Sequence, residues 1–112
     1  MADDLEKALA NVQSLNQQLQ AVLMQKQALA IQLREVEGAL EEVSKATDDV
    51  YKSVGPVLVK SNKDKISKEL NETKEQIELR LKALEKQEKS VQSGIAAAQS
   101  KLQQLVNPAK KE

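Results

Sequence analysis

The stretch VYKSVGPVLVK, residues 50–60, differs in composition from the sequence on either side of it. Its β-branched residues favour strands, and the Gly55-Pro56 pair in its middle favours a reversal of the chain. Both flanks are rich in Leu, Gln, Glu and Lys, which is typical of helices. The 112 residues suffice for one domain. We expect a helix at 4–48, a β-hairpin at 50–60, a second helix at 62–106 and a tail at 107–112.

Apolar residues recur with a seven-residue period in both flanks, as in a coiled coil. In the first flank, eleven of the twelve positions in two such series are apolar. These positions are Leu5, Val12, Leu19, Lys26, Leu33 and Leu40, and Ala8, Leu15, Val22, Leu29, Val36 and Val43. In the second flank they are Leu70, Ile77, Leu84, Val91, Ala98 and Leu105, and Ser67, Lys74, Leu81, Glu88, Ile95 and Leu102. We call these positions the seam, and they predict two long helices.

The ends of the second helix carry their own signals. Ser61 followed by Asp64 resembles a capping box, in which side chains bond the free amides of the first turn. Asn107-Pro108 is a stop signal. We therefore expect the second helix to begin directly after Ser61 and to end before Pro108.

An antiparallel arrangement matches the two seams. It pairs Leu5 with Leu105 and Leu29 with Leu81, and the numbers of each such pair add to 110, which places the fold-back at Gly55. The predicted fold class is mainly α: an antiparallel two-helix coiled-coil hairpin with a single β-hairpin at the fold-back. A dimer of one long helix is the alternative, which the glycine-proline pair disfavours because proline interrupts helical hydrogen bonding.

Composition argues against several classes of function. The chain has no Cys and no His, which argues against disulfides, thiol chemistry and the usual metal sites, and we expect no catalytic residue, cofactor or metal. Apolar runs are too short for a membrane span, and a cytoplasmic chain is the simplest interpretation. We expect neither a membrane nor a nucleic acid as partner. The single short basic cluster is Lys60, Lys63, Lys65 and Lys68, interrupted by Asp64.

The predicted β-hairpin is apolar on both faces of its second strand, since Val57 and Val59 point one way and Leu58 the other. Two strands alone are marginally stable in water, and the helices are not expected to cover both faces. We therefore expect other chains to cover this sheet, so that the hairpin is an assembly module. A loop packed on the helix ends is the alternative. The candidate oligomerisation residues are Val50, Tyr51, Val54, Val57, Leu58 and Val59.

Two stretches near the ends of the chain are almost uncharged. Residues 8–33 carry only Lys26, and residues 90–107 carry only Lys101. Extra leucines widen the apolar stripe there beyond a two-stranded seam, which indicates either a partner-binding surface or a further helix–helix contact. Lys26 and Glu88 can pair across the seam. The candidate binding residues are Leu5, Leu9, Val12, Leu15, Leu19, Leu23, Ile95, Leu102, Leu105 and Val106.

The order of a coiled-coil helix, VYKSVGPVLVK and a second helix containing KEQIELRLKALEKQE, residues 74–88, resembles the β class of prefoldin subunits of the archaeal type. The resemblance covers nearly the whole chain. Its most specific parts are the hairpin segment and ELRLKALEKQE, residues 78–88. The heptads alone would be weak evidence for the family.

This resemblance implies a hexamer with a prefoldin α-type subunit and other β subunits, in which the hairpins form a β-barrel platform. It also implies an ATP-independent holding chaperone, whose coiled-coil tips bind non-native polypeptides and deliver them to a group II chaperonin. The hairpin would map to residues 50–60, and the tips to residues 5–23 and 95–106. The lysine-rich residues 109–112 are a candidate chaperonin contact, with a disordered tail as the alternative. A structural tether or spacer with an oligomerising head is the rival interpretation.

Overall fold

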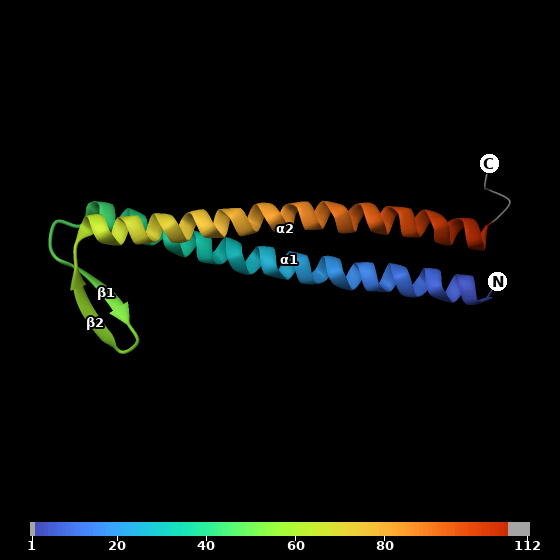
Figure 1. The fold of residues 1–112 in the computed structure, drawn as a ribbon, viewed down its shortest axis with the longest axis horizontal. Coiled ribbons are helices and arrows are strands. Elements are labelled where there is room, and N and C mark those ends of the chain that lie inside the picture. Colours follow the sequence, from blue (N-terminus) through green and yellow to red (C-terminus); the bar gives the residue numbers. More distant parts are fainter. Residues whose placement is uncertain (1, 108–112) are drawn as a thin grey trace. The chain divides into compact units, whose positions relative to one another are not determined.

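The fold consists of two long helices joined by one β-hairpin (Figure 1). The computed structural model describes residues 2–107. In chain order the elements are α1 (Ala2–Lys45), β1 (Val50–Val54), β2 (Val57–Ser61) and α2 (Lys63–Val106). This mainly helical architecture is the fold class that the sequence predicts. The first helix ends at Lys45, before the expected residue 48, and most of the expected tail lies outside the described residues.

The described residues form two compact units, and both helices contribute to each. The terminal unit comprises residues 2–26 and 83–107, and the hairpin unit comprises residues 27–82 with both strands. Each unit has buried apolar residues of its own. Those of the terminal unit are Ala8, Val22, Leu84, Val91 and Ala98, and those of the hairpin unit are Leu29, Ile66 and Ile77.

The heptad pattern accounts for which helical residues are covered. Every seam position of α1 and α2 is buried or half-buried. This includes the four polar ones, Lys26, Ser67, Lys74 and Glu88. Between the seam positions the helices are exposed almost throughout. A narrow apolar stripe facing one partner is what a two-stranded coiled coil requires.

The two helices run antiparallel within each unit. In the terminal unit, Lys26 pairs with Glu88, and the Leu15 methyl groups lie against Gly94. In the hairpin unit, Glu37 pairs with Lys74, and the Ser44 carbonyl accepts a hydrogen bond from Lys63. The residue numbers of these four pairs add to 114, 109, 111 and 107. All four values lie within about one helical turn of the expected 110.

The β-hairpin turns at Gly55-Pro56, as expected. Val54 pairs with Val57 across a two-residue loop, and Val50 pairs with Ser61 at the base. Gly55 has a φ of 58°, and proline fixes the next φ near −65°. A positive φ followed by a negative one is the pattern of a type II′ turn, whose twist matches that of the two strands.

The start of α2 differs from the expectation. Asn62, and not Ser61, caps the helix: its side-chain oxygen accepts a hydrogen bond from the Lys65 amide, and its carbonyl accepts one from Ile66. Ser61 is instead the last residue of β2. Lys63 in the same turn donates to the Ser44 carbonyl at the end of α1 (2.8 Å), where the helix dipole is negative. This bond links the two helix ends beside the hairpin.

Candidate interaction surfaces

The hairpin exposes nearly all of its apolar side chains. The strand pairing places Val54, Val57 and Val59 on one face of the sheet, and Tyr51 and Leu58 on the other. Their exposed fractions range from 48% for Val59 to 70% for Leu58. Of the six candidate oligomerisation residues, Val50 alone is half-buried. Both faces of the described sheet therefore offer apolar surface.

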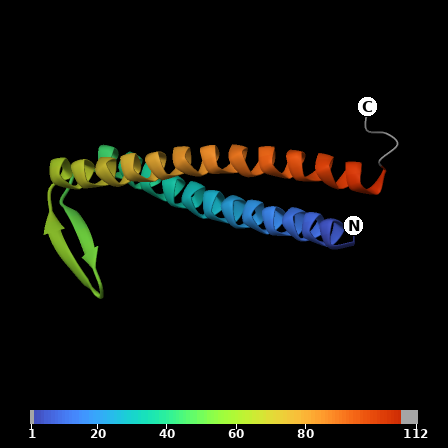
Figure 2. The same cartoon turned by 45° about the vertical axis from the view of Figure 1, so that its right-hand side comes forward.

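The sheet also offers hydrogen-bonding edges. It consists of two strands, so each strand has one edge without a neighbouring strand in the described chain. Figures 1 and 2 show the hairpin turn pointing away from the helices of its own unit. The helices of the unit therefore do not cover the sheet. A loop packed on the helix ends, the alternative interpretation, would be covered by them. Open edges and two apolar faces together fit the surface of an assembly module.

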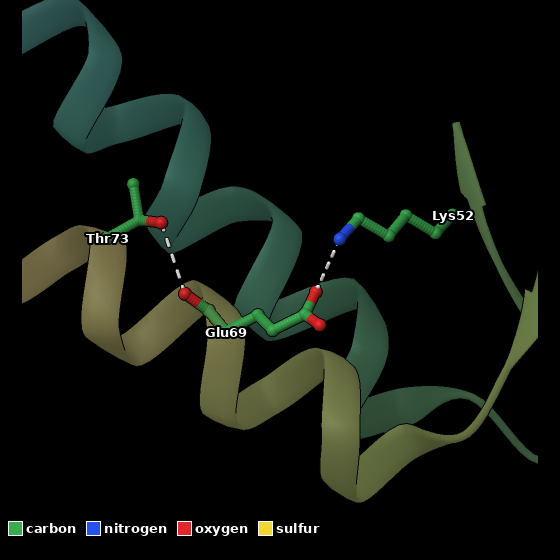
Figure 3. Close-up of polar contacts among 3 residues, drawn as sticks. All are labelled: Lys52, Glu69 and Thr73. Carbon is green, nitrogen blue, oxygen red and sulfur yellow. Dashed lines mark hydrogen bonds and ion pairs between the residues drawn. The ribbon is translucent and has the colours of Figure 1, made fainter. Parts of the chain in front are cut away.

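An ion pair connects strand β1 of the hairpin to α2. Lys52 Nζ lies 2.9 Å from Glu69 Oε2 (Figure 3). This hydrogen bond, opposed by partial burial and aided by the charges of Lys52 and Lys65, lowers the pKa of Glu69 below its ordinary value of 4.5. Thr73 donates to the backbone carbonyl of Glu69 one turn further on (3.1 Å). The pair was not foreseen, because no sequence period relates a strand lysine to a glutamate on a separate helix.

An open cavity of about 540 Å³ adjoins this ion pair. Its walls come from α1, β1 and α2, and they mix aliphatic with polar side chains. The apolar members include Val43, Val50, Ile66 and Leu70. Helix and strand are therefore separated by open space beside the pair.

The terminal unit contains all ten candidate binding residues, but it exposes them unequally. Leu9, Leu23 and Val106 are exposed, at 44%, 40% and 57%. The other seven are seam positions and are half-buried: Leu5, Val12, Leu15, Leu19, Ile95, Leu102 and Leu105. Met24, at 69% exposed, was missed, although its position two residues after the seam residue Val22 places it on the outer face of the helix. The exposed apolar surface of this unit thus consists of Leu9, Leu23 and Val106, which flank the seam, and of Met24 on the outer face.

A second cavity, of about 400 Å³, lies in the terminal unit between α1 and α2. Ala8 and Ala98 lie at its floor, where small side chains leave the helices poorly filled. Asp4, Lys7 and Lys101 lie at its rim, with Asn11 and Leu105. The opening is therefore lined by a few charges around a small apolar floor.

The seam of the terminal unit contains one charged pair. Lys26 Nζ lies 2.6 Å from Glu88 Oε1, and their side chains are 28% and 17% exposed. The hydrogen bond to Glu88 raises the pKa of Lys26 above its ordinary value of 10.5, partial burial opposes this rise, and the Glu88 and Glu85 charges add to it. A paired charge within an apolar seam penalises registers that would separate the partners. The expected pairing of these two residues is present.

No group of three or more Asp or Glu side chains within residues 2–107 is placed to hold a metal ion. Neither described helix has a stretch that is apolar enough to cross a membrane.

The fold and its surfaces define a class: a two-helix coiled-coil subunit that carries a single exposed β-hairpin. A family model described as "Prefoldin subunit" matches residues 6–109. The chain is 44% identical, over 93% of its length and 91% of the relative's, to prefoldin subunit beta of Archaeoglobus fulgidus. It is 42% identical to prefoldin subunit beta of Methanococcus vannielii, over 46% of each chain.

A solved structure shows the same architecture. The crystal structure of the prefoldin beta subunit from Thermococcus strain KS-1 superposes with a TM-score of 0.85 at 38% sequence identity, and the match covers 90% of each chain. The chain therefore belongs to the prefoldin family, and its similarity is to β-class subunits, as the resemblance implied. Membership implies a chaperone subunit that assembles with other prefoldin subunits.

Proposed function

We propose that this chain is a subunit of an ATP-independent holding chaperone of the cytoplasm. It assembles through its β-hairpin into a hexamer with an α-type subunit and further β subunits. The terminal units of the assembly capture non-native polypeptides and deliver them to a group II chaperonin. No catalytic step is part of this proposal.

The single observation that carries the proposal is the exposure of the hairpin. Tyr51, Val54, Val57, Leu58 and Val59 are each about half or more exposed on a sheet with open edges. Burial of apolar surface contributes roughly 25 cal/mol per Å², so neighbouring subunits that cover these residues would gain substantial stability. A hairpin left uncovered would be a site of uncontrolled edge pairing.

Client capture is assigned to the exposed apolar residues of the terminal unit. Leu9, Leu23, Met24 and Val106 offer aliphatic surface, and the surrounding residues are mostly uncharged. A surface without strong charge discriminates little between client sequences, which suits a protein that binds exposed apolar segments of many chains. Each site is small, so one subunit binds weakly. Several subunits on one platform raise the effective concentration and hold a client reversibly.

The test compares two variants that lose apolar surface in different units. The variant L9S/L23S/V106S removes exposed side chains of the terminal unit, and the control I31S/L79S removes exposed side chains of the hairpin unit. All five positions are at least 40% exposed, so we expect little loss of stability in either variant. Light scattering of an aggregating client, with each assembled hexamer present, measures holding.

We expect the first variant to lose most of its suppression of aggregation and the control to retain it. Deletion of residues 1–15 and 98–112 should have the effect of the first variant while the oligomer remains. Full suppression by the first variant would remove the terminal unit as the client site. Equal loss in both variants would indicate that exposed apolar surface in general, and not this unit, binds clients.

A further inference from the structure

The β-hairpin is attached to its unit with little apolar packing. Of the ten strand residues, only Val50 and Ser61 at the base are not exposed. Beyond the base lies the open cavity of about 540 Å³, between β1 and the two helices. Little apolar packing therefore fixes the angle at which the hairpin leaves α2.

A polar contact crosses this space. Lys52, two residues from the base of the hairpin, reaches Glu69 in the second turn of α2 at 2.9 Å (Figure 3). Lys52 is 51% exposed and Glu69 37%, so the pair contributes little to global stability. A weak contact can nevertheless decide between orientations of an element when no stronger contact opposes it, because the populations follow the small differences in free energy.

Glu69 is well placed to serve as the fixed end of such a contact. It belongs to a regular helix, and Thr73 donates to its backbone carbonyl. Lys52 holds the Glu69 carboxylate in its charged form, with Lys65 nearby. Lys52, the other end of the contact, lies on the exposed strand β1. The contact therefore joins the hairpin to a rigid element.

A second ion pair of the hairpin provides a comparison. Lys60 on β2 lies 3.3 Å from Asp49, in the segment that leads into β1. Both partners belong to the hairpin and its approach, so this pair does not connect the sheet to a helix. It carries the same charges as the Lys52–Glu69 pair and is more exposed, at 67% and 58%.

We propose that the Lys52–Glu69 pair is a strut that sets the angle of the β-hairpin on α2 and so presents the sheet to neighbouring subunits in one orientation. This inference rests on the proposed function in one respect. The orientation of the hairpin affects assembly only if the hairpin is the assembly module. Pre-ordering the hairpin in the free subunit reduces the ordering that association would otherwise require, and so favours assembly.

The angle can be measured directly because the chain has no cysteine. Spin labels on cysteines introduced as Leu58→Cys in β2 and Glu75→Cys in α2 report the distance from hairpin to helix, and both sites are exposed in the hairpin unit. Double electron–electron resonance, a pulsed electron paramagnetic resonance method, gives the distribution of that distance in the full chain. The variants to compare are K52E, E69K, the charge swap K52E/E69K, and the control K60E.

We expect one narrow distribution for the parent chain and for K60E. K52E and E69K each place like charges together, so their distributions should broaden or shift, and the swap should restore the parent distribution. In unlabelled chains, K52E should slow assembly with the α-type subunit about two- to fivefold, the range that an exposed ion pair can supply. The swap should restore the rate, and the melting of the helices should not change.

Each outcome decides a separate point. An unchanged distance distribution in K52E and E69K would overturn the strut, whatever happens in assembly. A changed distribution with an unchanged assembly rate would overturn its role in presentation. Failure of the parent chain to assemble with the α-type subunit would overturn the proposed function while leaving the distance result intact.

Discussion

At the scale of single residues, the helical glycines show how closely α1 and α2 approach. A Cβ added at Gly94 would lie 3.5 and 3.6 Å from the two methyl groups of Leu15, which is ordinary van der Waals contact. A Cβ added at Gly38 would meet nothing within 4 Å. Neither glycine has a positive φ, so both positions accept a side chain without backbone strain. Alanine at either position changes helix propensity, but only at Gly94 does it also add a packing contact.

We predict that G38A and G94A both stabilise the chain. Alanine in a helix interior is favoured over glycine by about 1 kcal/mol in the free energy of unfolding. G94A should gain at least as much as G38A, because its new methyl group also contacts Leu15. Urea unfolding followed by circular dichroism measures both. A loss of stability in G94A alone would contradict this prediction. It would show that the Leu15 methyl groups lie closer to position 94 than 3.5 Å and leave no room for a side chain.

The Lys26–Glu88 pair predicts a dependence of stability on alkaline pH. The folded-state pKa of Lys26 lies above its ordinary value of 10.5, so the folded chain holds this proton more tightly than the unfolded chain. The contribution is complete below pH 10.5 and is lost as the pH rises through the folded pKa. Urea midpoints across this range should fall more in the parent chain than in K26M. Parallel pH profiles in the two chains would show that the pair contributes nothing.

At the scale of elements, the hairpin depends on one backbone conformation. Gly55 has a φ of 58°, which costs an L residue with a Cβ roughly 1–2 kcal/mol. Nothing lies within 4 Å of a Cβ added there, so the cost of G55A is conformational and not steric. An isolated two-stranded sheet is only marginally stable in water, so a cost of this size is a large fraction of its stability. The turn glycine is therefore the most sensitive position of the hairpin.

We predict that G55A increases local opening of β1 and β2 without unfolding the helices. Hydrogen exchange of the strand amides should quicken about five- to thirtyfold, as a cost of 1–2 kcal/mol implies. K60A, an exposed substitution on β2, serves as the control and should leave exchange nearly unchanged. Equal protection in G55A and the parent chain would mean that the turn tolerates a side chain after all.

Much of this element structure could be predicted from the sequence. The seven-residue period gave the seam, because burial in a coiled coil follows that period, and every predicted seam position is covered. Gly55-Pro56 gave the turn, because few residue pairs support a tight reversal. The cap of α2 was placed one residue early. Ser61 resembles a cap locally, but its pairing with Val50 extends the sheet, and the cap passes to Asn62.

The interaction surfaces were less predictable, for a physical reason. Periodicity separates seam from surface, but the predicted binding set mixed both kinds, so seven of its ten members are half-buried and Met24 was omitted. The Lys52–Glu69 contact could not be predicted because it depends on the angle between a sheet and a helix, which no local pattern encodes. Whether the predicted binding residues bind clients stays a prediction.

At the scale of the whole molecule, most of the exposed large apolar residues of the described chain fall into two sets, and Ile31 and Leu79 on the helices of the hairpin unit belong to neither. One set lies on the hairpin, and the other lies on the helices of the terminal unit. Because the two sets belong to different units, a substitution in one should leave the function of the other intact. This separation allows assembly and client capture to be tested independently.

The central claim is that the β-hairpin assembles the subunits, and native mass spectrometry tests it most directly. The chain and the variant V57S/L58S/V59S are each mixed with an α-type subunit, and the masses of the complexes are measured. These positions are 48–70% exposed in the free chain, so the variant should fold. We predict a hexamer of two α-type subunits and four copies of the parent chain, and separate subunits for the variant. A hexamer of the same subunit composition formed by the variant, or no complex formed by the parent chain, would contradict the account.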